Sequence, residues 1–251
     1  MAVVRALQRT LPHEDVLLLV DHAFAPYARR PRRVTSVRVR RLVGALADAG
    51  AKAVVLASRT ATLDHDPGTP DVPVPVIGLE PALARAVARP GVGGAALVAG
   101  VDCLRSPTLL SELRRAGGRV RPVTADLWPG LSALVEAGPA AEADLRRLVD
   151  RRVAQLVEGG TGVIALGCVH AAAVAPLVSA AAGGRLEIVD SALLTVGRTR
   201  GVLAQQGLLV RRRRPGWCRV MSSQPTAARA WPRPTPHTAG GPALASDPAG
   251  D

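Results

Sequence analysis

The chain has 251 residues, of which 48% are hydrophobic and 2% aromatic, and its formal net charge is +12. This length fits one large domain or two small ones with an aliphatic core, and no apolar run reaches the roughly 18 residues that a membrane-spanning helix needs. The basic residues are nearly all arginines, scattered without aromatic partners apart from one run at 211–214, so we expect a solvated surface and no nucleic-acid partner.

The first residues of the chain and its cysteines favour a soluble, cytoplasmic protein. Residues 1–15 are typical of an amphipathic helix and not of a signal peptide, because no long apolar core precedes a small-residue cleavage site. Cys103, Cys168 and Cys218 are too few and too far apart for a disulfide framework or a zinc site. The Asp and His residues within 63–68 precede Pro-Gly and are typical of a solvated turn, so we expect no metal site.

Aliphatic strand patterns alternate with helical patterns along the chain, which predicts an α/β fold of parallel sheets with buried strands. The predicted strands cover residues 16–21, 52–58, 74–79, 94–100, 161–167 and 186–192. The predicted helices cover residues 35–51 (with a Thr or Ser cap and a Gly stop), a stretch that begins at Pro81, 106–118 and 141–160. Residues 222–251 are rich in Pro, Gly, Ala and Ser, and are expected to form a disordered tail.

Two stretches of the sequence are similar to each other. Residues 51–61 and 161–171 align without gaps, and each has a buried strand followed by Ser58 or Cys168, with Thr60 or a histidine two positions on. Ligands of open α/β sheets bind beyond the carboxyl ends of the strands, so in two facing domains Ser58 and Cys168 would approach one cleft. A chance likeness of short strand ends is the alternative. By itself, the pair Cys168 and His170 favours a buried, inert thiol at a strand end beside a histidine with satisfied hydrogen bonds, because free cysteine is commonly buried.

In seven segments, taken in order over about residues 1–220, the chain resembles the glutamate racemases of the aspartate/glutamate racemase superfamily. These segments are "LPHEDVLLLVDHAFAPYA", "GAKAVVLASRTAT", "VPVIGLEPAL", "LVEAG", "VIALGCVHA", "IVDSA" and "LAQQGLLVRRRRPG". The resemblance implies two pseudo-symmetric α/β domains, with the active-site cleft between them and the C-terminal segment packed on the first domain. The domains would be residues 1–85 with 191–221, and residues 86–190.

The family's reaction, as the resemblance implies it, interconverts L- and D-glutamate for peptidoglycan precursors without a cofactor. A proton leaves Cα on one face and another returns on the opposite face, so two acid–base groups must flank the carbon, and the family uses one cysteine from each domain. The implied catalytic positions are Cys168, His170, Glu136 and, where the first cysteine would stand, Ser58. The implied substrate-binding positions are Tyr27, Ala28, Arg59, Thr60, Val169 and Ser106.

Departures from the family pattern point to an impaired racemase. The hydroxyl of Ser58 is a far weaker acid than a thiol. By the resemblance, we also expect the family's first strand and its Asp-Ser-Gly loop to be missing, because the matched segments begin just after them. Arg59 would repel an α-ammonium group and attract a carboxylate, unless it points to solvent. The alternatives are a single-cysteine decarboxylase or isomerase of small carboxylic acids, similar to arylmalonate decarboxylase, and a non-catalytic binding or regulatory homologue. The expected partner is a small amino acid or dicarboxylate, and a homodimer is left open.

Overall fold

The computed structural model describes residues 2–64, 72–79, 86, 93–99, 123–126, 128–212 and 214–223, and strands alternate with helices through them. The strands are β1 (Val16–Val20), β2 (Val54–Val55), β3 (Val76–Ile77), β4 (Gly94–Val98), β5 (Val123–Asp126), β6 (Thr161–Leu166), β7 (Glu187–Asp190) and β8 (Cys218–Ser222). The helices are α1 (Ala2–Thr10), α2 (Arg32–Asp48), α3 (Arg59–Asp64), α7 (Leu131–Ala137), α8 (Glu142–Glu158), α9 (Val169–Ala173), α10 (Ala175–Ala182) and α11 (Ser191–Gln205), with 3-10 turns η1 (Tyr27–Arg29) and η2 (Gly138–Ala141).

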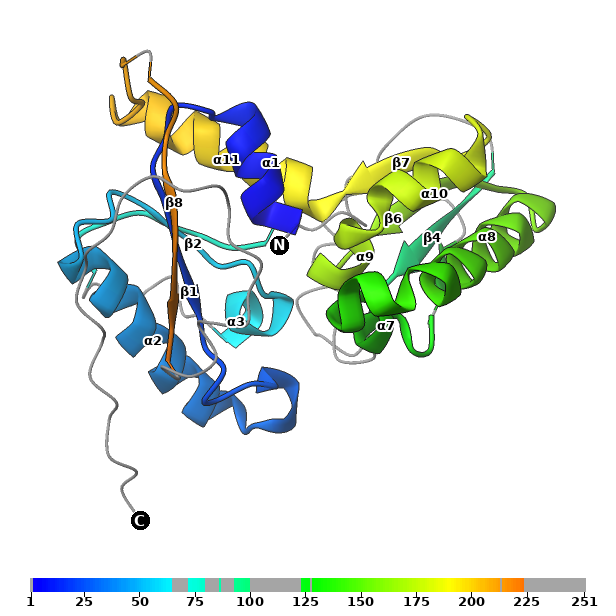
Figure 1. Cartoon of the computed structure of the whole chain (residues 1–251), viewed down its shortest axis with the longest axis horizontal. Helices are drawn as coiled ribbons and strands as arrows, with labels where there is room; N and C mark the ends of the chain where they lie inside the picture. Colours follow the sequence, from blue (N-terminus) through cyan, green and yellow to red (C-terminus); the bar gives the residue numbers. More distant parts are fainter. Residues whose placement is uncertain are drawn as a thin grey trace.

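These elements form two lobes. Figure 1 shows β1, β2, β8, α2 and α3 in one lobe and β4, β6, β7 and α7 to α10 in the other, with α1 and α11 side by side at the top of the first. Every strand pairing among the described residues is parallel, in the orders β1-β8, β2-β3 and β5-β4-β6-β7. The fold is therefore mixed α/β with parallel sheets flanked by helices, as the sequence predicts.

The last strand of the described chain returns to the first lobe. Val16 lies opposite Cys218 and Val20 lies opposite Ser222, so β8 runs beside β1 over the full length of both strands. Helix α11 packs on α1 along the same return path. Strand β8 and helix α11 therefore pack on the first strand and the first helix of the described chain.

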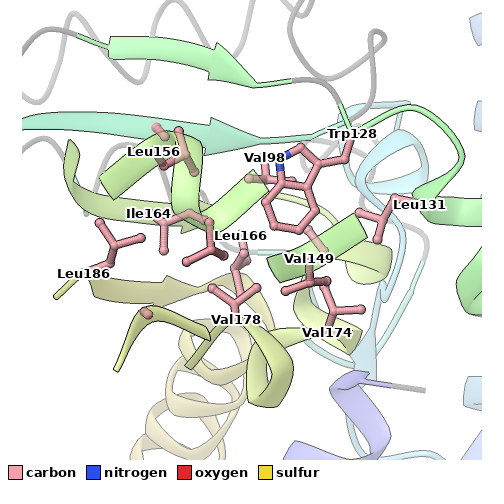
Figure 2. Packing of buried hydrophobic residues seen from close by; sticks show 14 of the residues in the cluster. Val98, Trp128, Leu131, Val149, Leu156, Ile164, Leu166, Val174, Val178 and Leu186 are labelled. Carbon is pink, nitrogen blue, oxygen red and sulfur yellow. The ribbon is translucent and has the colours of Figure 1, made fainter. Parts of the chain in front are cut away.

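The second lobe has the larger apolar core. Strand β6 is central in its sheet, and its residues 163–166 are at most 1% exposed, because side chains of successive residues enter opposite faces and both faces are covered. Ile164 and Leu166 pack with Trp128 and helices α8 and α10, as Figure 2 shows. Helix α8 presents the apolar side chains that complete this face: Leu148, Val149, Val153 and Leu156.

Two sequence predictions of element boundaries are wrong. Helix α2 begins at Arg32 and not at a Thr35 cap, because Pro31 sets the helix entry and Thr35 is buried one turn inside, where its Oγ1 donates to Pro31 O over 3.4 Å. The tail cannot begin at residue 222, because Ser222 ends β8 and the Ser223 amide donates to Val20 O over 3.1 Å.

Some predicted elements lie outside the described residues, namely the helix from Pro81 apart from Ala86, the helix over 106–118 and the tail beyond residue 223. Within the described part of the chain, no helix is long and apolar enough to span a membrane.

Candidate active site

Cys168 lies at the junction between strand β6 and helix α9. It is extended (φ −141°, ψ 165°), and its Sγ accepts a hydrogen bond from the Ala171 amide at 3.5 Å. Burial by itself raises the pKa of this thiol, but hydrogen bonds from the His170 side chain and the Ala171 amide outweigh it, so the pKa of Cys168 lies below its ordinary value. The local fold therefore favours a thiolate at this strand end.

His170 connects Cys168 with Glu136 from helix α7. Its Nε2 lies 3.1 Å from Glu136 Oε1, and its side chain is 31% exposed. The hydrogen bond with Cys168 is the largest cause that raises the pKa of His170, and the Glu136 carboxylate adds to it against the effect of burial. Each partner in the row Glu136–His170–Cys168 thus stabilises the charged form of the next, which is the arrangement of an activated thiol.

Ser58 occupies the equivalent junction in the first lobe, between strand β2 and helix α3. Its Oγ accepts a hydrogen bond from the Ala61 amide at 3.3 Å, so both side chains accept from the amide three residues on. The structure thereby confirms that the sequence similarity of the two stretches reflects equivalent local geometry. The chemical difference is that a hydroxyl replaces the thiol.

One cavity of about 920 Å³ reaches both lobes. Ser58 and Thr60 line it from the first lobe, and Glu136, Val169 and His170 line it from the second. Residues of both junctions therefore line one space, although Cys168 itself is not among its lining residues. Cys168 lies directly before Val169 and His170 in the chain.

Tyr27 also lines the cavity, and a buried carboxylate fixes its position. Its hydroxyl donates to Asp21 Oδ2 at 2.8 Å, while Arg38 donates to both oxygens of Asp21 at 3.0 and 2.8 Å. Burial and the Asp21 carboxylate raise the pKa of Tyr27 strongly, so its hydroxyl stays protonated. Ala28 lies beside it in turn η1.

Arg59 does not face the cavity. Its side chain is buried, and Nη1 donates to Leu79 O at 3.0 Å, at the end of strand β3. The solvent-facing orientation considered from the sequence is therefore not observed. A guanidinium that follows a strand end can turn inward when a main-chain carbonyl is there to accept its hydrogen bond.

Comparison with known proteins decides the family. The model of the Asp/Glu/Hydantoin racemase family matches residues 1–199. This chain belongs to that family. It is 36% identical over 217 residues to the glutamate racemase of Deinococcus radiodurans, which covers 83% of this chain and 73% of that protein.

Solved racemases share the fold. A glutamate racemase isoform of Bacillus anthracis has a TM-score of 0.73 at 22% identity, over 90% of this chain and 85% of that one. The glutamate racemase of Escherichia coli, solved in complex with L-glutamate and an activator, has a TM-score of 0.70 at 19% identity, over 90% of this chain and 86% of that one. The chain is thus a glutamate racemase-like protein with the two-lobed racemase fold.

Two residues of the site in this racemase-family chain were not expected from the sequence. Asp21 and Arg38 hold Tyr27, and Asp21 could have been found because it follows a predicted strand directly, where functional side chains of α/β folds gather. Ser106 and Cys103 lie outside the described residues. Burial raises the pKa of Cys218, which starts strand β8, so its thiol stays neutral.

Proposed function

We propose that this protein transfers protons at Cα of glutamate without a cofactor, in the cytoplasm and for peptidoglycan precursor supply, with one strong and one weak acid–base group. The observation that carries the proposal is the pair of equivalent junctions at one cavity, of which only Cys168 has an ionisable group with an imidazole partner. The buried position of Arg59 supports an amino-acid substrate, because this guanidinium does not meet an α-ammonium group in the cavity.

The proposed chemistry starts at Cys168. Its thiolate takes the Cα proton, the C–H bond breaks, and the electron pair remains on Cα and spreads into the α-carboxylate. His170, held by Glu136, stabilises the thiolate before the transfer. Return of a proton from Cys168 regenerates the original enantiomer, whereas return from the Ser58 hydroxyl inverts it. The second route is slow because a serine hydroxyl is a very weak acid.

The site would lie between two domains. We propose residues 1–85 with 191–221 as the first domain and 86–190 as the second, a division that the β1-β8 pairing and the packing of α11 on α1 support. Thr60, Val169 and Tyr27 would contact the substrate, since each lines the cavity.

The test is proton exchange compared with inversion. In D₂O, NMR follows loss of the Cα proton of L- and D-glutamate, and chiral chromatography follows inversion. We expect exchange to exceed inversion by about 100-fold, the typical contribution of one acid–base group. Cys168→Ala should abolish both rates, while Cys218→Ala, which removes a thiol elsewhere, should leave both unchanged. Equal rates of exchange and inversion, or activity that survives in Cys168→Ala, would contradict the proposal.

A single ionisable thiol also fits a decarboxylase. In that reaction the C–C bond of a malonate-type acid breaks, CO₂ leaves, and Cys168 gives its proton to the carbanion, so nothing is required of Ser58. Release of CO₂ from disubstituted malonates, without exchange on glutamate, would favour this function. Absence of turnover with both substrate classes would favour a non-catalytic binding or regulatory homologue.

A further inference from the structure

Leu79 lies two residues beyond strand β3, and both polar groups of its main chain are bound to helix α3. Arg59 Nη1 donates to Leu79 O over 3.0 Å, and Leu79 N donates to Thr62 Oγ1 over 2.9 Å. Both partners belong to α3, the helix that begins directly after Ser58. The main chain of Leu79 is therefore fixed relative to the Ser58 junction.

Gly78 permits this close contact between the end of β3 and helix α3. A Cβ atom added at Gly78 would lie 2.4 Å from Thr62 Cγ2, which is closer than packed side chains approach. Thr62 cannot rotate away without losing hydrogen bonds, because its Oγ1 accepts from Leu79 N and donates to Ser58 O over 2.8 Å. A side chain at position 78 would therefore separate Leu79 from α3.

The side chain of Leu79 makes a different contact, in an apolar cluster between the lobes. It is 1% exposed and is the largest buried side chain of this interlobe cluster. In Figure 1 the amino end of α1 and the first turn of α11 lie where the two lobes meet. The other buried members come from three helices: Val3 and Ala6 of α1, Ala172 of α9, and Ala192 and Val196 of α11.

Helix α9, which contributes Ala172 to the interlobe cluster, begins directly after Cys168 and includes His170. It has only five residues, and a helix this short depends on packing for its placement. Helices α1 and α11 both contact it, and Ala172 is 4% exposed. Leu79 is thus bound through its main chain to the helix after Ser58, and packs through its side chain in one cluster with the helix after Cys168.

We propose that Leu79 is a positioning residue that sets the spacing between the Ser58 and Cys168 junctions. Truncation of its side chain leaves the hydrogen bonds within each junction intact, because each of them joins residues of a single lobe. It changes the placement of one junction relative to the other. A displacement of about 1 Å can slow a reaction by about 100-fold. The effect on inversion rests on the function proposed above, whereas the effect on spacing does not.

Cross-linking between the junctions measures their spacing without a substrate. In a chain with Ser58→Cys, Cys103→Ala and Cys218→Ala, a short bismaleimide bridges the thiol at position 58 and Cys168, and mass spectrometry of the linked peptides gives the rate. We expect Leu79→Ala to slow this cross-linking at least tenfold. Leu79→Met nearly conserves the volume and should cross-link at the parent rate.

Leu186→Ala is the matched control for the loss of a buried leucine side chain. Leu186 directly precedes β7, at the amino edge of the sheet, whereas Cys168 lies beyond the carboxyl end of the parallel strand β6. This variant removes the same atoms from the second-lobe core and should leave cross-linking unchanged. Leu79→Val, a smaller truncation, takes the place of Leu79→Ala if that variant does not fold.

Two further measurements separate positioning from a general loss of structure. The pH midpoint of Cys168 alkylation should not move in Leu79→Ala, because Cys168, His170 and Glu136 all lie in the second lobe. In the Ser58→Cys background, inversion of glutamate should fall about 100-fold while Cα exchange stays within about twofold.

Unchanged cross-linking in Leu79→Ala, an equal loss in Leu186→Ala, or a shifted Cys168 midpoint would overturn the positioning role of Leu79. If glutamate undergoes neither exchange nor inversion, the proposed function fails, and cross-linking still decides whether Leu79 sets the spacing of the two junctions.

Discussion

Ser58 and Cys168 are equivalent residues of the two lobes: each lies between a strand and the helix that begins at the next residue, and each accepts a hydrogen bond from the amide three residues on. The supporting backbone for a thiol therefore exists at both positions. In the described part of the chain, a hydrogen-bonded pair of His170 and Glu136 lies beside Cys168, and no such pair lies beside Ser58. The difference between the lobes lies in side-chain chemistry and not in their local fold.

Ser58→Cys should raise the rate of glutamate inversion. The new thiol would keep the Ala61 amide as its donor and would supply an acid near neutrality on the face opposite Cys168. We expect an increase of about 100-fold in inversion and little change in Cα exchange, measured by chiral chromatography and NMR. Ser58→Ala is the matched control and should leave exchange intact. If Ser58→Cys stays at the native inversion rate, the proposed weak group is not Ser58.

The pH dependence of alkylation by iodoacetamide should differ between Cys168 and Cys218. The thiolate is the reactive form, so a lowered pKa moves the alkylation midpoint of Cys168 to lower pH than that of free cysteine. Cys218, whose pKa is raised by burial, should react only at higher pH. Mass spectrometry of each peptide gives both midpoints from one experiment.

Glu136→Gln should shift the Cys168 midpoint upward. The variant removes the carboxylate that helps to raise the pKa of His170, so the imidazolium that stabilises the thiolate is less populated. An unchanged midpoint in this variant would show that Glu136 does not act through His170.

Asp21→Asn should destabilise the protein by about 2 kcal/mol. The variant removes a largely buried carboxylate that accepts hydrogen bonds from Arg38 and Tyr27. Bonds from these partners outweigh the effect of burial and lower the pKa of Asp21, so its stabilising contribution is present above the unfolded-state pKa and is lost as pH falls through the folded pKa. In urea unfolding at several pH values, the free energy of unfolding should therefore fall less on acidification in Asp21→Asn than in the native chain.

Arg147→Ala is the control. It breaks an exposed ion pair with Asp144 and should change the free energy of unfolding by less than about 0.5 kcal/mol.

Arg59→Met should affect folding and not substrate affinity. The variant leaves Leu79 O without its donor, and we expect a loss of about 1 to 2 kcal/mol in urea unfolding. The KM for glutamate should stay within about twofold, because the side chain does not face the cavity. A KM that rises with unchanged stability would restore the substrate-contact hypothesis for Arg59.

The sequence predicted what depends on pattern and chain order. Strand and helix alternation indicated the parallel sheets, and the resemblance to the glutamate racemases implied Cys168 with His170 and, from the segment at residues 134–138, Glu136. Side-chain direction was not predictable, because Arg59 follows a strand end as Ser58 does and yet turns inward to a carbonyl that is 20 residues away in sequence. The Asp21–Arg38 pair was missed for the same reason, since it links a strand end to the middle of a helix.

The pairing of β1 with β8 also constrains how the protein is made. His22 and its hydrogen-bond partner Ser222 are 200 residues apart in sequence. During synthesis, β1 leaves the ribosome long before β8 exists, whereas β4, β5, β6 and β7 all lie between Gly94 and Asp190 and have emerged before β8 is made. The second lobe can therefore complete its sheet cotranslationally. The aliphatic strand β1, by contrast, has no β8 to pair with until residues 218–222 have been synthesised. Folding of the first lobe is expected to be the slow, aggregation-exposed step of biosynthesis.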